Sequence, residues 1–268
     1  MYRIRESRKP VAWLAASALL LTTARLVTAA EGGVDQWKYE ATIYMWAAGM
    51  DANTETGGDI DISFNDILDD LDVAFMGSLG ARKGKWSVVA DTIYLDISQN
   101  EGGSETIPIL GPVTTKTTVD TDIDMKASIT TFGGGYNLND NAKWTLDLIA
   151  GGRYTWVNVD SELDLKRNGV LPQTSRQGKV SDSKNLWDGI VGVRGQFNLN
   201  DHWYVSYYAD IGGGQSDRTW QALAGIGYKF RLGDLLLAYR HLEYEFDSGF
   251  LLKDLSVSGP ALGARFHF

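Results

Sequence analysis

The chain has 268 residues, a formal net charge of −9 and no cysteine. An acidic chain is not expected to bind nucleic acid, because affinity for a phosphate backbone needs clustered basic residues. Without cysteine, neither disulfide bonds nor thiol chemistry is available. Beyond residue 30 no stretch approaches the roughly 20 apolar residues of a membrane-spanning helix. A closed β-barrel is therefore the only structure with which this later part of the chain would cross a bilayer.

The first 30 residues have the pattern of a signal peptide. Basic residues at positions 3, 5, 8 and 9 precede an apolar run over residues 11–24, and Thr28-Ala29-Ala30 supplies the small residues of a cleavage site. Cleavage after Ala29 or Ala30 leaves a mature barrel domain of residues 31–268 with a net charge of −13. A helical membrane anchor is the alternative, but Arg25 interrupts the apolar run.

After residue 35 the sequence alternates between apolar and polar residues in segments separated by turn residues, which predicts β-strands. The fold class that we expect is all-β, a transmembrane antiparallel up-and-down barrel of about ten strands. Eight or twelve strands remain possible, because strand boundaries are uncertain and residues 59–64 could form an extra ribbon. The expected strands cover residues 36–50, 72–82, 86–98, 119–135, 143–165, 186–199, 203–213, 218–231, 235–246 and 253–268.

The predicted connections alternate in length. Short turns are expected at residues 83–85, 138–142, 199–202 and 231–234, and long loops at residues 51–71, 99–116 and 166–184. Bacterial barrels have short periplasmic turns and long external loops, and an even strand number puts both termini on the periplasmic side.

One part of the first long loop has helical spacing. Phe64, Ile67, Leu68 and Leu71 recur at helical intervals behind Asn65 or Asp66 as a possible cap. This pattern predicts a short helix packed on the barrel mouth or inserted into it, with an ordinary loop as the alternative.

The last strand carries the signature of an outer-membrane barrel. Leu262 and Ala264 alternate with polar residues, and the chain ends on an aromatic carboxyl terminus. Aromatic side chains at the predicted periplasmic strand ends are expected to lie at the membrane interface, where an apolar ring with a polar atom is favoured. These interface residues are Trp37, Trp86, Trp144, Trp203, Phe266 and Phe268.

Polar and charged residues occupy the opposite face of the same strands. Opposite charges and amides that face a lumen can satisfy one another, and a lumen filled in this way is closed. The predicted lumen network comprises Asp147, Arg153, Asp188, Arg194, Asp210, Gln221, Arg240 and Arg265.

Several motifs together resemble a proteobacterial family of small outer-membrane β-barrel proteins of uncharacterised function. The motifs are Trp187-Asp188-Gly189-Ile190-Val191-Gly192-Val193-Arg194, Asp210-Ile211-Gly212-Gly213, Thr219-Trp220-Gln221-Ala222 and Tyr239-Arg240-His241-Leu242, with Phe64-Asn65-Asp66-Ile67-Leu68-Asp69-Asp70-Leu71-Asp72 and Phe75-Met76-Gly77 in the first half. The resemblance implies a barrel in the outer membrane of a Gram-negative bacterium. It implies no substrate and no catalytic residue.

For function, the sequence favours a structural or surface-interaction role, with weak passive transport as an additional activity and a narrow porin-like channel as the alternative. We expect no enzyme activity; the remote alternative is a hydrolase that uses His241 beside Glu243 and Glu245. Asp120, Asp122 and Asp124 lack the glycine and distant glutamate of a calcium loop, so neither a metal nor a cofactor is expected.

The expected partners follow from the predicted location. They are outer-membrane lipid, lipopolysaccharide and the barrel-assembly machinery, which would recognise the C-terminal strand at residues 253–268. The oligomeric state remains open, because residues that face lipid and residues that face a partner have the same composition.

Overall fold

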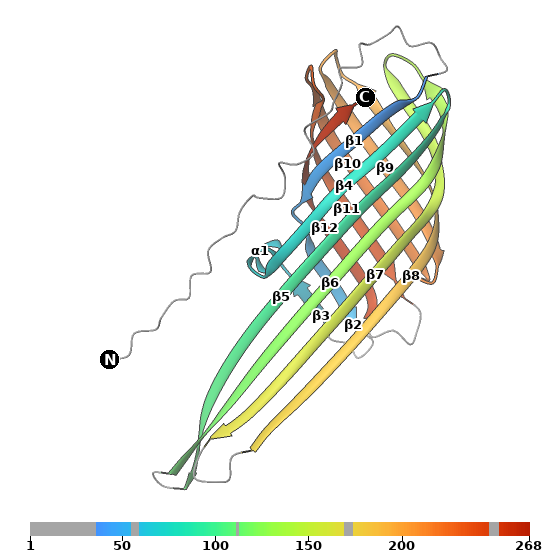
Figure 1. The fold of residues 1–268 in the computed structure, drawn as a ribbon. Helices are drawn as coiled ribbons and strands as arrows, with labels where there is room; N and C mark the ends of the chain where they lie inside the picture. The colour runs from blue at the N-terminus through green and yellow to red at the C-terminus, as the bar shows by residue number, and fades with distance from the viewer. Residues whose placement is uncertain (1–35, 55–58, 111–112, 169–173, 247–251) are drawn as a thin grey trace. The chain divides into compact units, whose positions relative to one another are not determined.

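A computed structural model describes residues 36–54, 59–110, 113–168, 174–246 and 252–268. The predicted signal peptide lies outside these residues. Ten antiparallel strands form a closed barrel (Figure 1), which confirms the predicted fold class and strand number. The barrel strands are β1 (Lys38–Trp46), β4 (Leu71–Lys83), β5 (Trp86–Leu110), β6 (Val113–Asp140), β7 (Trp144–Asn168), β8 (Thr174–Asn198), β9 (Trp203–Gly214), β10 (Arg218–Lys229), β11 (Asp234–Glu245) and β12 (Leu252–His267).

The first and last strands close the barrel. In the antiparallel register of β1 and β12, Glu40 lies opposite His267 and Trp46 lies opposite Ala261. The final residue takes part, since Tyr39 and Phe268 exchange two backbone hydrogen bonds of 3.0 and 2.9 Å. Pairing of β1 with both β4 and β12 closes the wall, as is required of a sheet that enters a bilayer.

The barrel has two different ends. Both β1 and β12 reach one end, which we call the turn end, and the short connections β4–β5, β6–β7, β8–β9 and β10–β11 lie there. The connections at the opposite, distal end include residues 47–70. The positions of the four short connections, and of the long one at residues 47–70, agree with the sequence prediction.

The predicted first long loop contains secondary structure. After a break at Ala47 and Ala48, β2 (Gly49–Thr54) continues along β12 and also pairs with β3 (Asp59–Ile62). The ribbon expected at residues 59–64 is therefore β3, which pairs with β2 and is not part of the barrel wall.

The helix α1 (Phe64–Asp69) follows β3 directly. Its N-cap is Ser63, whose hydroxyl accepts a hydrogen bond from the Asp66 amide while the Asp66 carboxylate accepts one from the Ser63 amide. The predicted caps Asn65 and Asp66 were wrong by two or three residues, since Asp66 is the third helical residue of this capping box. No residue of α1 is buried, so the helix does not enter the lumen. Among the described residues, no helix has the length and hydrophobicity needed to cross a membrane.

Strands β5, β6, β7 and β8 are longer than the sequence predicted, with 25 to 28 residues each. They extend past the other strands as a four-stranded sheet (Figure 1). The predicted loops at residues 99–116 and 166–184 were wrong, because most of their residues continue the strands. Once neighbouring strands are in register, each further residue gains a ladder hydrogen bond, and this outweighs local turn propensity.

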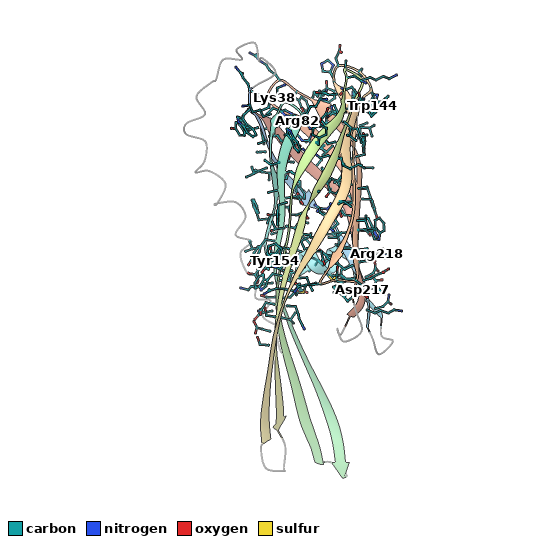
Figure 2. All side chains as sticks on the ribbon, turned by 90° about the vertical axis from the view of Figure 1, so that its right-hand side faces the viewer. Lys38, Arg82, Trp144, Tyr154, Asp217 and Arg218 are labelled. Atoms are coloured by element: carbon teal, nitrogen blue, oxygen red, sulfur yellow. The ribbon has the colours of Figure 1, made fainter. Side chains whose placement is uncertain are left out.

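Side chains alternate between the interior and the exterior of the barrel. Exterior positions are apolar and exposed, as at Leu148 (50% exposed) and Leu237 (54%), whereas the neighbouring interior residue Asp147 is 2% exposed. Figure 2 shows the side chains around the wall, from Lys38 and Arg82 at the turn end to Asp217 and Arg218 at the distal end. An exposed apolar band around a polar interior is the pattern of a transmembrane barrel.

Candidate functional site

The half of the lumen nearest the turn end contains a cavity of about 390 Å³. Its wall includes Lys38 and Arg82 near the strand ends, and Tyr44, Asp91 and Arg240 deeper in the barrel. The cavity therefore extends from the turn end into the middle of the lumen. Three groups of hydrogen-bonded charges and one apolar cluster fill the space around and beyond it.

The first group centres on the buried carboxylate of Asp147. The Arg82 guanidinium pairs with this carboxylate, and the Arg194 Nε lies 3.3 Å from the same oxygen. The Asn137 amide donates to the second oxygen at 2.7 Å, and Arg194 also donates to the Ser87 hydroxyl at 3.0 Å. Two guanidinium groups thus share one carboxylate, which leaves a local excess of positive charge.

The second group is an ion pair without solvent exposure. Arg153 Nη2 lies 2.6 Å from Asp210 Oδ2, and both side chains are 0% exposed. The guanidinium also donates to the hydroxyls of Thr219 at 2.8 Å and Thr131 at 3.2 Å, while the Tyr208 hydroxyl donates to Asp210. These bonds link strands β6, β7, β9 and β10 across the lumen.

The third group surrounds Arg240 on β11. Its guanidinium donates to Asp91 at 3.0 Å, to Gln221 at 2.8 Å and to the Tyr44 hydroxyl at 2.8 Å. The Trp46 ring lies 5.0 Å from the guanidinium carbon, within cation–π range. Arg240 therefore connects the polar networks to the apolar cluster that begins at Trp46.

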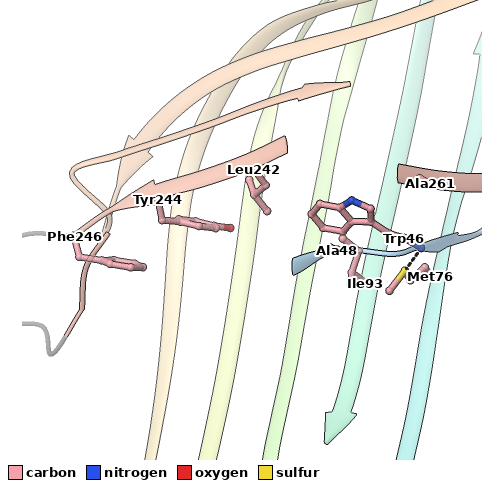
Figure 3. Packing of buried hydrophobic residues seen from close by; sticks show 8 residues of the cluster. All are labelled: Trp46, Ala48, Met76, Ile93, Leu242, Tyr244, Phe246 and Ala261. Atoms are coloured by element: carbon pink, nitrogen blue, oxygen red, sulfur yellow. Dashed lines mark hydrogen bonds between the residues drawn. The ribbon is translucent and has the colours of Figure 1, made fainter. Parts of the chain in front are cut away.

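That apolar cluster occupies the distal half of the lumen (Figure 3). Leu242 and Tyr244 are 0% and 1% exposed, and the Trp46 indole donates to the Gly259 carbonyl at 3.1 Å. We call these residues the plug: Trp46, Ala48, Met76, Ile93, Leu242, Tyr244, Phe246 and Ala261. Partly buried apolar side chains, among them Leu95 and Ile129, pack against these residues in the same part of the lumen.

Two of the eight predicted lumen residues have surroundings that differ from the rest. Asp188 is buried, but it accepts a hydrogen bond from the Ser216 amide at 2.9 Å and anchors the β9–β10 turn, so its contact is not with an arginine. Arg265 lines the cavity with a buried Nε that has no hydrogen-bond partner among the described residues. The prediction also missed two charged members of these groups, Arg82 and Asp91, although both alternate with apolar residues in strands that the sequence predicted.

At the turn end, Asp234 forms a smaller polar group on the interior side. Its carboxylate accepts a hydrogen bond from the Tyr204 hydroxyl at 3.0 Å and lies 3.1 Å from His267 Nε2. Both partners come from neighbouring parts of the wall, so this group fixes the turn end of β11 against β9 and β12.

The six predicted interface aromatics all lie at the turn end and are exposed. Their exposed fractions range from 38% at Trp144 to 72% at Phe268. A second level of exposed aromatics toward the distal end was missed, although Trp187 and Trp220 stand in the motifs singled out in the sequence. Its exposed members are Phe75, Phe132, Trp187 and Tyr239, and the half-buried Tyr154 and Trp220 pack against this level.

His241, the residue considered for hydrolysis, lies on the exterior side of β11. Its Nε2 is 3.4 Å from Glu243, and its ring is 4.5 Å from that of Trp220. The alternation along β11 buries Arg240 and Leu242, so His241 points away from the lumen. It therefore lies in the distal aromatic level and not in a cavity of the barrel.

The described residues contain no group of three or more histidine or acidic side chains placed to hold a metal ion. The side chains of Asp120 and Asp122 lie outside the described set. Asp96 and Lys126 pair at 3.3 Å beyond the distal aromatic level. The hydrogen bond from Lys126 to Asp96 and the attraction between the two charges raise the pKa of the lysine. Asp96 is thus already paired with a cation.

No protein-family profile and no curated protein matches this sequence. Similar solved structures include the outer membrane protease OmpT of Escherichia coli, with a TM-score of 0.46 and 9% identity over 87% of this chain and 97% of that one. The translocator domain of the autotransporter NalP of Neisseria meningitidis has a TM-score of 0.42 and 13% identity over 89% and 90% of the chains. Ail, the attachment invasion locus protein of Yersinia pestis, has a TM-score of 0.35 and 12% identity over 87% and 99%. The family resemblance expected from the motifs stays a prediction.

Proposed function

We propose that this protein is an integral outer-membrane barrel that is sealed in its distal half and displays a four-stranded sheet outside the cell for interaction with other molecules. The observation that carries the proposal is the combination of a plugged lumen with strands β5–β8 that continue past the barrel. A plugged lumen argues against transport, and an extended sheet has no role in forming the wall.

The exterior of the barrel supports the location. Trp144 and Tyr154, in the two aromatic levels, are ten residues apart on β7, or about 33 Å along the strand. At a strand tilt of about 40°, this length spans about 25 Å, the height of the apolar band of an outer-membrane barrel. Between them, Leu148 is exposed on the outside, as lipid contact requires.

The edges of the extended sheet support the interaction role. β4 pairs with β5 only as far as Ile97, and β9 pairs with β8 only from Asp188 onward. Beyond these positions, β5 and β8 each have a strand neighbour on one side only, among the residues that the structure describes. Edge strands with free backbone groups can pair with a strand from another chain.

Other partners follow from the same proposal. Lipopolysaccharide would contact the barrel on the side of the outer leaflet. The assembly machinery would recognise β12 through its exposed Leu262 and Phe266, together with the terminal Phe268. The His241 hydrolase remains the remote alternative, with no support from a cavity at that residue.

An epitope tag inserted after Leu110, between β5 and β6, is expected to bind antibody on intact cells. The same tag inserted after Gly84, in the turn between β4 and β5, is expected to bind only after the outer membrane is permeabilised. The two insertion sites lie at opposite ends of β5, one in its connection to β4 and the other in its connection to β6. Flow cytometry of both variants measures the difference. Staining of the Gly84 variant on intact cells would contradict the proposed orientation.

The alternative is a narrow channel, which the cavity at the turn end favours. We expect the folded protein in a planar bilayer to give no regular conductance steps, because the plug fills the distal lumen. Replacing Trp46 and Leu242 with alanine is expected to produce such steps, whereas Leu148→Ala on the exterior is expected to leave the bilayer silent. Regular steps from the unmodified protein would favour the channel and contradict a sealed barrel.

A further inference from the structure

We infer that the cavity at the turn end is a binding site for a small organic anion that carries a carboxylate or phosphate group. This inference goes beyond the proposed function, since neither surface display nor a sealed lumen needs a ligand there. The argument rests on the charge of the cavity wall, on polar groups without partners, and on the size and lining of the space.

The charge of the wall is opposite to that of the whole chain. The protein carries a net charge of −9. Its cavity wall, however, contains five cationic side chains and three carboxylates. The cations are Lys38, Arg82, Arg194, Arg240 and Arg265, and the carboxylates are Glu40, Asp91 and Asp147. The cavity is therefore positive in an acidic protein, and field lines in a low-dielectric enclosure concentrate anions there.

The carboxylates do not neutralise all of these cations. Asp147 is shared by Arg82 and Arg194, and Asp91 pairs with Arg240. Arg265 stands opposite Asp234 in the register of β11 and β12, but it forms no ion pair within 4.0 Å among the described residues, and its buried Nε lacks a hydrogen-bond partner. A guanidinium in this condition has donors available for a bidentate anion.

A second polar group in the wall also lacks a partner. The Ser206 side chain on β9 is buried, with the residue 8% exposed, and its hydroxyl makes no hydrogen bond with any described residue. A buried hydroxyl without a hydrogen-bond partner is unfavourable, so a ligand that accepts its hydrogen bond would be stabilised by this group. Ser206 and Arg265 line the same cavity from different strands.

The remaining lining indicates that the ligand has an apolar body as well as a charge. Val89, Leu223 and Leu236 contribute aliphatic surface, and Tyr208 contributes aromatic surface. A volume of about 390 Å³ falls within the range of small-molecule sites, which combine apolar walls with a few convergent polar groups. Inorganic ions alone would leave the apolar surface without a contact.

The test is isothermal titration calorimetry of the folded protein in non-ionic detergent with benzoate, phenyl phosphate and neutral benzamide at constant ionic strength. We expect at least one of the two anions to bind about tenfold or more tightly than benzamide, because only the anions form charge-assisted hydrogen bonds. The anion that binds more tightly identifies the head group. Equal binding of all three probes, or no binding of either anion, would overturn the inference.

Two variants with opposite expected effects test whether the anion binds in this cavity. Arg265→Gln is expected to weaken anion binding by about tenfold, and Glu40→Gln to strengthen it several-fold by removing a carboxylate from the wall. The matched control is Arg218→Gln, which removes a guanidinium that pairs with Glu245 outside the cavity. Each variant is first shown to fold by heat-modifiable migration in electrophoresis. If Arg265→Gln and Arg218→Gln bind the anion with equal affinity, and Glu40→Gln does not change that affinity, the cavity is not the anion site.

Discussion

Replacing Arg153 with methionine is expected to lower the free energy of unfolding by about 3–5 kcal/mol, because the change leaves the Asp210 carboxylate buried without its counter-ion. Both side chains are 0% exposed, and their closest atoms are 2.6 Å apart. Thr131 and Thr219 also lose the guanidinium to which they are hydrogen-bonded. Urea unfolding of the protein reconstituted in liposomes measures the change.

Two further variants separate a buried charge from a general packing defect. The double variant Arg153→Met with Asp210→Leu is expected to recover most of the lost stability, because neither charge then remains buried. Arg218→Met, which breaks the exposed pair with Glu245, is expected to cost less than about 1 kcal/mol. A double variant as unstable as Arg153→Met would show that packing, not the unpaired carboxylate, causes the loss.

Replacing Leu148 with arginine is expected to lower the free energy of unfolding by about 2–4 kcal/mol in a bilayer. Leu148 lies on β7 between Trp144 and Tyr154, so the new charge would face the middle of the lipid layer. An exposed position on a protein surrounded by water would tolerate the same change to within about 0.5 kcal/mol. The variant therefore tests whether the exterior band contacts lipid.

The matched control is Leu232→Arg in the turn between β10 and β11. Leu232 is 84% exposed at the turn end, where an arginine side chain reaches the aqueous interface. We expect its cost to be about 0–1 kcal/mol. Equal small costs at both positions would mean that the band at Leu148 is not immersed in lipid.

The strand pattern was predictable because it depends on local alternation. From β9 to β12 the predicted boundaries agree with the structure to within two residues, and the turns after β9 and β10 are marked by glycine and aspartate. In β5–β8 the alternation pattern placed the distal strand ends too early. Segments with ordinary loop residues continue there as strands, because the neighbouring strand already offers hydrogen-bond partners.

The polar interior was predictable in position but not in pairing. Alternation places Arg153 and Asp188 on the interior face of adjacent strands, directly opposite one another. In the structure, however, Arg153 pairs with Asp210 from β9, and Asp188 holds the Ser216 amide. Side-chain length and barrel curvature decide which groups meet across a lumen, and a one-dimensional pattern contains neither.

The sequence by itself therefore determined the barrel class, the strand number, the apolar exterior and the aromatic level at the turn end. These features follow from a period of two residues and from turn chemistry, both of which are local. Only the tertiary structure decided that the plug residues come together in the lumen, that a cavity lined mainly by cations lies at the turn end, and that four strands extend beyond the wall. Each of these depends on which residues far apart in the chain are brought together when the barrel closes.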